Sequence, residues 1–324
     1  MRAIRWTLDE SAAVAASPDL HRILGTAVGV PILAVDVGER SDKSEQLGAV
    51  LAGLPVVAMA VGTGAHPAWD LAGPSPDSAI DTVLAFPNAS VIAAQVLRGH
   101  ERRSAGEGLL VESLAYAALQ GGPEFATWLA GRGHRVRRDL DEPRIEMHDH
   151  GDSVEIVLNR PRLHNLMDAS MRDQLVTALV AGGAEPDRTI LIRANGPSFC
   201  GGGDPAEFGT VADTATAHLI RSSANVAPAL LAVSERTTVE IQGPAVGAGI
   251  ELAAFAGCVR ATTDATFRLP ELQMGLIPGA GGTVSIPARI GRQRTLEWLL
   301  SGAELDADTA LSWGLVDNLI DAAN

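Results

Sequence analysis

The sequence predicts an α/β protein built in two parts, and three observations lead to that prediction. The chain has 324 residues and is 46% hydrophobic, which suits two domains or one large one with a sizeable core. Strand-like and helix-like patterns alternate in its first part, and residues 132–152 are polar and charged. The remainder carries three glycine-rich turns. We therefore expect an α/β domain at residues 1–131, a linker at 132–152 and a second domain at 153–324.

The first part contains a βαβ pattern. The apolar runs at residues 31–37 and 54–61 predict buried strands, and residues 42–51 between them predict a short helix. Such a crossover makes the two strands parallel. Further along, the patterns predict a third strand at 80–86, a helix at 90–97 and a longer helix at 108–130 that breaks near residues 121–123.

Strands and helices also alternate in the second part. Asp168 can cap a helix whose apolar positions are Met171, Leu175, Val176, Leu179 and Val180. Residues 189–193 and 238–241 predict strands. We expect one helix to begin at or just before Glu251 and another to cover residues 292–301, where Gly302 ends it.

Composition and charge exclude several classes of protein. The formal net charge of −14 disfavours binding to nucleic acid or to an anionic membrane. Two cysteines without a CxxC motif indicate no disulfide framework and favour a reducing compartment. The N-terminus lacks the apolar segment of a signal peptide, and no apolar run reaches the ~20 residues of a membrane span. We expect a cytoplasmic protein.

Two glutamates and three glycine-rich turns carry the most specific chemical signal. The turns are Phe-Cys-Gly-Gly-Gly-Asp at 199–204, Gly-Ala-Gly-Ile-Glu at 247–251, and Ile-Pro-Gly-Ala-Gly-Gly at 277–282, preceded by Pro-Glu at 270–271. Small residues let backbone N–H groups approach a ligand, and two such turns can hold one developing oxyanion. Two carboxylates at the same place can move protons or position water.

The order and spacing of these motifs resemble the crotonase superfamily, the enoyl-CoA hydratases and isomerases. The resemblance begins near residue 145 and includes Val-Glu-Ile-Val-Leu-Asn-Arg-Pro at 154–161, Arg-Leu-His-Asn-Leu-Met at 162–167 and Ala-Leu-Ser-Trp-Gly-Leu-Val-Asp at 310–317. It implies a crotonase-type core of stacked ββα turns, preceded here by a smaller α/β domain.

The resemblance implies a role for each glutamate and each turn. The backbone N–H groups of Gly203 and Ala248 match the family's oxyanion hole for a thioester carbonyl. Ala248 stands where the family usually has glycine, so its methyl group can crowd the acyl chain. Glu251 would position and activate water, and Glu271 would exchange the proton at C2 of the acyl chain.

The same resemblance implies an acyl-CoA as the ligand, with coenzyme A as part of the substrate and no separate cofactor or metal. The residues that it assigns to the coenzyme or substrate are Arg162, His164, Cys200, Gly202, Asp204 and Pro205. For Arg162, a solvated surface charge without a role in binding is an equally good interpretation. Cys200 reads as a small packing residue, because no histidine is placed to activate its thiol.

The expected function is addition of water to a 2-enoyl-CoA, or the reverse, which makes the protein a lyase of fatty acid metabolism. Double-bond isomerisation with Glu271 alone and other acyl-CoA enolate chemistry are alternatives within the same site. A non-catalytic coenzyme A-binding subunit is an alternative from another class.

Two departures from the family pattern lead to a hypothesis about residues 1–131. The chain ends soon after the motif at 310–317, where family members usually continue with a helical tail that supports trimers or hexamers. About 144 residues precede the crotonase-like region. We expect the helix at 108–130 to pack against the crotonase-like core, to replace the tail and to help complete the acyl-CoA site.

Overall fold

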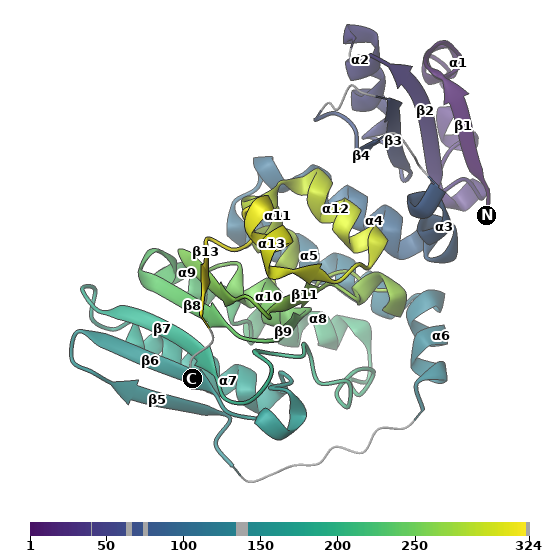
Figure 1. The fold of residues 1–324 in the computed structure, drawn as a ribbon. Coiled ribbons are helices and arrows are strands. Elements are labelled where there is room, and N and C mark those ends of the chain that lie inside the picture. Colours follow the sequence, from purple (N-terminus) through teal and green to yellow (C-terminus); the bar gives the residue numbers. More distant parts are fainter. Residues whose placement is uncertain (40, 63–66, 74–76, 134–141, 322–324) are drawn as a thin grey trace.

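A parallel four-stranded sheet forms the N-terminal part of the molecule (Figure 1). The computed structural model describes residues 1–39, 41–62, 67–73, 77–133 and 142–321. The sheet order is β1 (Ala3–Thr7), β2 (Ile32–Gly38), β3 (Val57–Gly62) and β4 (Leu71–Gly73), and the helices that accompany it are α1 (Leu8–Ala15) and α2 (Asp42–Leu51). The predicted parallel β2–α2–β3 unit is confirmed. The sequence patterns did not indicate β1 or α1.

Four helices lead from this sheet toward the rest of the molecule: α3 (Asp77–Ala85), α4 (Pro87–Arg98), α5 (Ala105–Gln120) and α6 (Pro123–Gly131). The strand predicted at residues 80–86 is wrong, because α3 covers most of that segment. The predicted break at residues 121–123 is confirmed and separates α5 from α6. The expected packing of this region on the second part is confirmed too, since α5 contacts both α8 (Thr214–Ser223) and α11 (Gly282–Ile290).

A six-stranded sheet organises the second part. Its order is β13 (Asn318–Ile320), β10 (Cys258–Thr262), β8 (Thr237–Ile241), β7 (Thr189–Ala194), β6 (Ser153–Leu158) and β5 (Ile145–Asp149). All neighbours are parallel except β5 and β6. The expected linker at 132–152 is therefore corrected in part, because residues 145–149 form an edge strand. Residues 134–141 of that segment lie outside the described residues.

The remaining elements stack against this sheet and confirm a mixed α/β fold. A small sheet joins β12 (Leu305–Asp306), β11 (Thr266–Arg268) and β9 (Pro244–Val246). The other helices are α7 (Ala169–Gly182), α9 (Ala227–Val233), α10 (Ala248–Ala253), α12 (Arg292–Ser301) and α13 (Ala307–Trp313). Asp168 caps α7 as predicted, and Gly302 ends α12 in a left-handed conformation. Helix α10 begins at Ala248, slightly earlier than expected.

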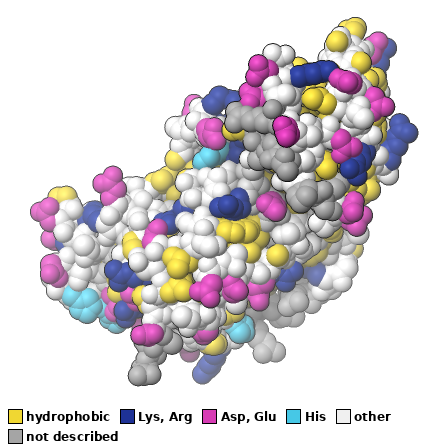
Figure 2. All heavy atoms as spheres, turned by 45° about the horizontal axis from the view of Figure 1, so that its top comes forward, with side chains coloured by type: hydrophobic (Ala, Val, Ile, Leu, Met, Phe, Trp, Pro, Cys, Tyr) yellow, Lys and Arg dark blue, Asp and Glu magenta, His cyan; other side chains and the backbone are white. Residues whose placement is uncertain are grey.

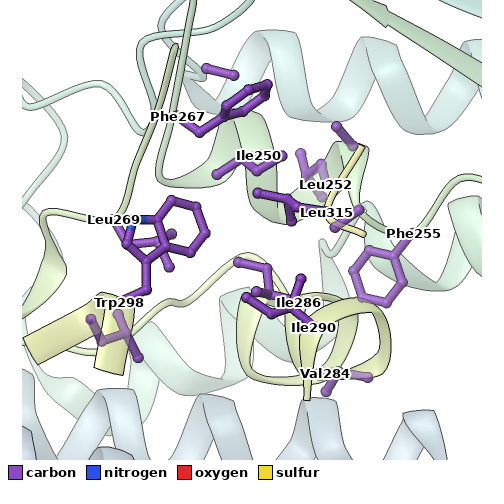
Figure 3. Close-up of a cluster of buried hydrophobic side chains, with 14 of the residues drawn as sticks. Ile250, Leu252, Phe255, Phe267, Leu269, Val284, Ile286, Ile290, Trp298 and Leu315 are labelled. Carbon is purple, nitrogen blue, oxygen red and sulfur yellow. The ribbon is translucent and has the colours of Figure 1, made fainter. Parts of the chain in front are cut away.

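Helices α10, α11 and α12 share one hydrophobic core. Figure 3 shows Ile250 of α10, Ile286 and Ile290 of α11 and Trp298 of α12 converging on a common space with Phe267. These side chains are buried, and close packing of this kind fixes the positions of the turns that connect the helices. The core therefore positions the glycine-rich segments that precede α10 and α11.

A buried ion pair links α4 to the N-terminal sheet. The Arg98 guanidinium donates to both oxygens of Asp70, at 2.8 and 2.5 Å, and to three backbone carbonyls of residues 52–56. Arg292 of α12 also approaches Asp70, at 3.7 Å. Both side chains of the main pair are almost fully buried. Asp70 thus holds together elements of both parts of the molecule.

The outer surface mixes acidic and basic side chains with small hydrophobic patches on the face shown in Figure 2. Among the described residues, no single helix has the length and apolar character needed to cross a membrane. One pair of helical pieces in the described part, residues 77–85 and 87–102, meets the length and composition together, but the two pieces are bent by 112°.

Replacing Arg98 with methionine should lower the free energy of unfolding by about 3–5 kcal/mol, because the buried Asp70 carboxylate loses its main partner. Urea unfolding of wild type and variant measures the change. The double variant Asp70→Asn/Arg98→Met should recover part of the loss, since it buries no unpaired charge. A double variant that is as unstable as the single one would contradict this account.

Candidate active site

The glycine-rich turns border a cavity of about 400 Å³. Its walls come from both parts of the chain, with Tyr116 and Gln120 on α5, Trp128 on α6 and Arg221 on α8. The turns at 201–203 and 247–248 line it together with Glu251 and Glu271. The structure therefore brings the two predicted glutamates and both predicted oxyanion donors to one cavity.

The first two turns approach each other closely. A Cβ atom added at Gly202 would lie 3.0 Å from the Val246 carbonyl oxygen and 4.0 Å from the Ala248 nitrogen. Met167 pairs with the first turn through the Gly202 carbonyl and the Asp204 N–H, which leaves the Gly203 N–H outside these bonds. Ala248 is the first residue of α10, where an N–H has no intrahelical acceptor. Both N–H groups are thus available to a ligand.

Glu251 and Glu271 converge on Gly247. A Cβ atom at Gly247 would lie 2.5 Å from Oε1 of Glu271 and 3.9 Å from Oε1 of Glu251. Gly247 has φ of +48°, a conformation that favours glycine. Two constraints therefore favour glycine at position 247: the backbone conformation and the space taken by the two carboxylates. Any larger side chain would displace a carboxylate.

The third turn holds Glu251. Its Oε2 accepts hydrogen bonds from the backbone N–H groups of Ala280 at 2.7 Å and Gly282 at 2.9 Å. Burial raises the pKa of Glu251 to about 7, and these hydrogen bonds oppose the rise by stabilising the ionised form. Glu251 is 2% exposed, and its Oε1 remains directed at the side of Gly247. Glu251 can therefore act as a base near neutral pH.

Glu271 lies in a less polar environment. It begins a short 3₁₀ turn, Glu271–Met274, and is 6% exposed. Among the described residues, its buried Oε2 has no hydrogen-bond partner. Burial, followed by the charge of Glu251, raises the pKa of Glu271 well above its usual value. A protonated Glu271 beside an ionised Glu251 is the arrangement that these environments favour.

A third buried carboxylate, Glu112 of α5, was not predicted from the sequence. Its Oε1 accepts from the Gly281 N–H at 2.7 Å, and its Oε2 accepts from the Thr283 N–H at 2.8 Å and hydroxyl at 2.7 Å. Burial, and then the charge of Glu251, raises the pKa of Glu112 to about 8. Glu112 thus fixes the same turn that holds Glu251. The one available signal was an acidic residue in the middle of α5, among the apolar residues 109–111 and 114–119.

Tyr116, one turn further along α5, was also missed. Its ring packs on Gly279, where an added Cβ atom would lie 2.5 Å from the ring. The Arg221 guanidinium lies over the same Tyr116 ring, 4.1 Å from its centroid. Trp128 of α6 stacks near Phe125 and meets Phe208 edge to face. Residues of the N-terminal part therefore form much of the cavity wall.

The predicted coenzyme and substrate residues divide into two groups. Gly202, Asp204 and Pro205 line the cavity, although the Asp204 carboxylate is engaged by Arg160 at 2.7 Å. Arg162, His164 and Cys200 do not line it. Arg162 is exposed, and His164 is hydrogen-bonded to Ser198 through Nδ1 at 2.9 Å.

Cys200 is fully buried behind the first turn. Its carbonyl accepts from the Val246 N–H at 2.9 Å, and a Cβ atom at Gly249 would clash with that carbonyl. Burial raises the pKa of the Cys200 thiol to about 11, which agrees with a packing residue.

The matched part of this chain is similar to known enzymes. The family model described as enoyl-CoA hydratase/isomerase matches residues 151–324. The enoyl-CoA isomerase/hydratase fer4 of Mycosarcoma maydis is 32% identical over 174 residues, which are 51% of this chain and 64% of that protein. The probable enoyl-CoA hydratase echA8 of Mycobacterium tuberculosis is 31% identical over 170 residues, 52% of this chain and 65% of that protein. The chain thus covers less than two thirds of either relative.

Solved structures agree with this assignment. The enoyl-CoA hydratase from Thermoplasma volcanium GSS1 aligns with a TM-score of 0.53 and 31% identity, over 56% of this chain and 73% of that one. A structure from Mycobacterium abscessus described as a putative enoyl-CoA hydratase/isomerase aligns with a TM-score of 0.51 and 33% identity. The crotonase-type fold expected for the second part is confirmed, and the chain belongs to the enoyl-CoA hydratase/isomerase family.

Proposed function

We propose that this protein adds water to the double bond of a 2-enoyl-CoA thioester, or catalyses the reverse dehydration. The observation that carries the proposal is the convergence of Glu251 and Glu271 on Gly247, beside the available N–H groups of Gly203 and Ala248. Membership of a family named for hydration and isomerisation supports the acyl-CoA part of the proposal. Coenzyme A enters as part of the substrate, with no separate cofactor.

The proposed proton transfers follow from the two environments. Ionised Glu251 accepts a proton from water as its oxygen bonds to C3, and the electrons move through C2 toward the thioester carbonyl. The Gly203 and Ala248 N–H groups stabilise the negative charge that develops on the thioester carbonyl oxygen. Protonated Glu271 then donates its proton to C2, which completes the addition of water. A proton returning from Glu251 to Glu271 restores the starting state.

Three alternatives use the same cavity differently. An isomerase would need one residue to remove and return the proton, so Glu271 alone would suffice. Other enolate chemistry, such as decarboxylation or thioester hydrolysis, would use the oxyanion donors. A non-catalytic coenzyme A-binding subunit would not need a second buried carboxylate, whose burial is costly without a function. The hydrogen bonds that hold Glu251 therefore favour hydration.

The remaining contacts of the substrate are proposals of the same kind. We place the coenzyme's phosphates near the exposed Arg162 and near His164, at the end of the cavity formed by residues 201–203. By family resemblance, the protein would act as a trimer or hexamer in the cytoplasm. Light scattering on the purified chain measures the oligomeric state.

Glu251→Gln and Glu271→Gln should each lower kcat by about 10²–10⁴-fold, because each removes one proton-transfer group. The assay follows loss of the conjugated thioester absorbance of a short 2-enoyl-CoA. Glu297→Gln, at an exposed glutamate of α12, is the matched control. If Glu251→Gln retains conversion of a 3-enoyl-CoA while Glu271→Gln loses it, the isomerase reading replaces hydration. Thioester binding without turnover would favour a non-catalytic subunit.

The rate of hydration should rise with pH through about 7, because Glu251 must be ionised and its pKa is raised to about 7. A glutamate with its usual pKa of 4.5 would place this rise about 2.5 pH units lower. Burial and the charge of Glu251 raise the pKa of Glu271 well above its usual value, and because Glu271 must be protonated to donate, the rate should fall again as Glu271 ionises at higher pH. The measurement is kcat/KM against pH. A flat profile between pH 5 and 8 would contradict the assigned roles.

Glu112→Gln should lower kcat by about tenfold or more with little change in KM, because the amide cannot accept all three hydrogen bonds and the turn that holds Glu251 shifts. Thr283→Val removes only the hydroxyl donor to the same carboxylate and should have a smaller effect. Glu107→Gln, on the exposed face of α5, is the control. Wild-type kcat in Glu112→Gln would show that the turn is held without this contact.

A further inference from the structure

Arg221 contributes a cation to the wall of the active-site cavity. Its Nη2 donates to the Gln120 side-chain oxygen at 2.8 Å, and its Nη1 lies 3.3 Å from both the carbonyl and the hydroxyl oxygen of Ser113. The guanidinium also covers the ring of Tyr116. These contacts hold the side chain in place with neutral groups alone.

The charge of Arg221 is not neutralised locally. Within the described part of the chain, no carboxylate lies within ion-pair distance of its guanidinium. Glu112 has only a longer-range electrostatic effect on Arg221. Both Glu112 carboxyl oxygens accept hydrogen bonds from residues 281 and 283 instead. Burial lowers the pKa of Arg221, although an arginine remains protonated.

The arginines with almost fully buried side chains have carboxylate partners, whereas the half-buried Arg132 and Arg236 donate to backbone carbonyls and do not line the cavity. Arg98 pairs with Asp70, Arg144 with Asp168 and Arg160 with Asp204. The chain has 39 acidic against 25 basic residues, so acidic partners are plentiful. A half-buried arginine without one, lining the cavity of the candidate active site, is expected to receive its counterion from a ligand.

The position of Arg221 identifies which part of the ligand it meets. The Gly201 N–H donates to the His164 carbonyl, which places the turn at 162–164 at the end formed by the first glycine-rich turn. Tyr116 packs on Gly279, next to the segment that holds Glu251. An acyl chain whose carbonyl reaches Gly203 and Ala248 therefore runs past the glutamates toward Tyr116 and Arg221.

We propose that Arg221, held over the Tyr116 ring, binds a carboxylate at the far end of the acyl chain, so that the preferred substrates are 2-enoyl-CoA thioesters of dicarboxylic acids. This inference rests on the proposed function. Arginine suits the role because its planar N–H groups match both oxygens of a carboxylate. Trp128, Phe208 and Val211 supply an apolar wall for the methylene groups between thioester and carboxylate.

A matched substrate pair tests the proposal. The probes are trans-2-hexenoyl-CoA and the six-carbon trans-2-enoyl-CoA whose chain ends in a carboxylate. Wild type should favour the carboxylate-ended substrate by about tenfold or more in kcat/KM, the range expected for a charged hydrogen-bonded contact. Arg221→Gln should abolish the preference and change hexenoyl-CoA turnover only a few-fold. Arg221→Lys, which keeps the charge without the fork, should retain part of it.

Arg294→Gln is the control, because Arg294 also lies over an aromatic ring, that of Trp313, but does not line the cavity. It should leave the preference unchanged. Equal turnover of both substrates by wild type would overturn the inference and leave the proposed hydration intact. Equal losses on both substrates in Arg221→Gln would indicate a contact with coenzyme A instead, and would overturn it too.

A binding measurement keeps the inference testable if neither substrate is converted. Calorimetry with hexanoyl-CoA and its carboxylate-ended counterpart should show about tenfold tighter binding of the latter to wild type. The difference should disappear in Arg221→Gln. Equal binding of the two saturated thioesters to wild type would reject the carboxylate site, whereas failure of hydration alone would reject only the proposed reaction.

Discussion

Glu112 and Glu251 both place a carboxylate at the N-terminus of α11, and the successive backbone N–H groups there alternate between them. Ala280 and Gly282 donate to Glu251, whereas Gly281 and Thr283 donate to Glu112. Buried carboxylates need such donors, and a helix N-terminus supplies both N–H groups and a favourable dipole. One short segment thereby fixes a predicted catalytic side chain and anchors α5 of the N-terminal part.

This shared anchor explains the electrostatics of the site. Three buried glutamates lie near one another, and the charge of Glu251 opposes the ionisation of both Glu112 and Glu271. Glu251 and Glu112 receive backbone donors, whereas Oε2 of Glu271 has no partner among the described residues. The donors limit the rise in the pKa of Glu251 and of Glu112, and Glu271 has no such donor at Oε2, so Glu251 ionises more readily than Glu271. The proposed division into base and acid follows from hydrogen bonding rather than from residue type.

Sequence reasoning worked where the signals are local. Helix α2 lies between two apolar strands and α12 ends at Gly302, and both were predicted with their observed bounds. Residues 80–86 were mistaken for a strand because a short apolar run fits either period. Strand β5 was hidden in a polar segment because it is an exposed edge strand. The turns around Glu251 and Glu271 were found because glycine spacing is itself a local pattern.

Glu112, Tyr116 and Arg221 were missed because their significance depends on distant contacts. Glu112 meets a turn 169 residues away in the chain, and no periodicity in α5 records that contact. The position of these residues in the chain also matters for the proposed choice of substrate. The family match covers the glutamates and the oxyanion turns, whereas Tyr116, Gln120 and Trp128 lie before residue 151, where it begins. The residues proposed to act on the thioester therefore lie within the family match, whereas the wall proposed to meet the acyl group combines residues before 151 with Phe208 and Arg221 of the matched part.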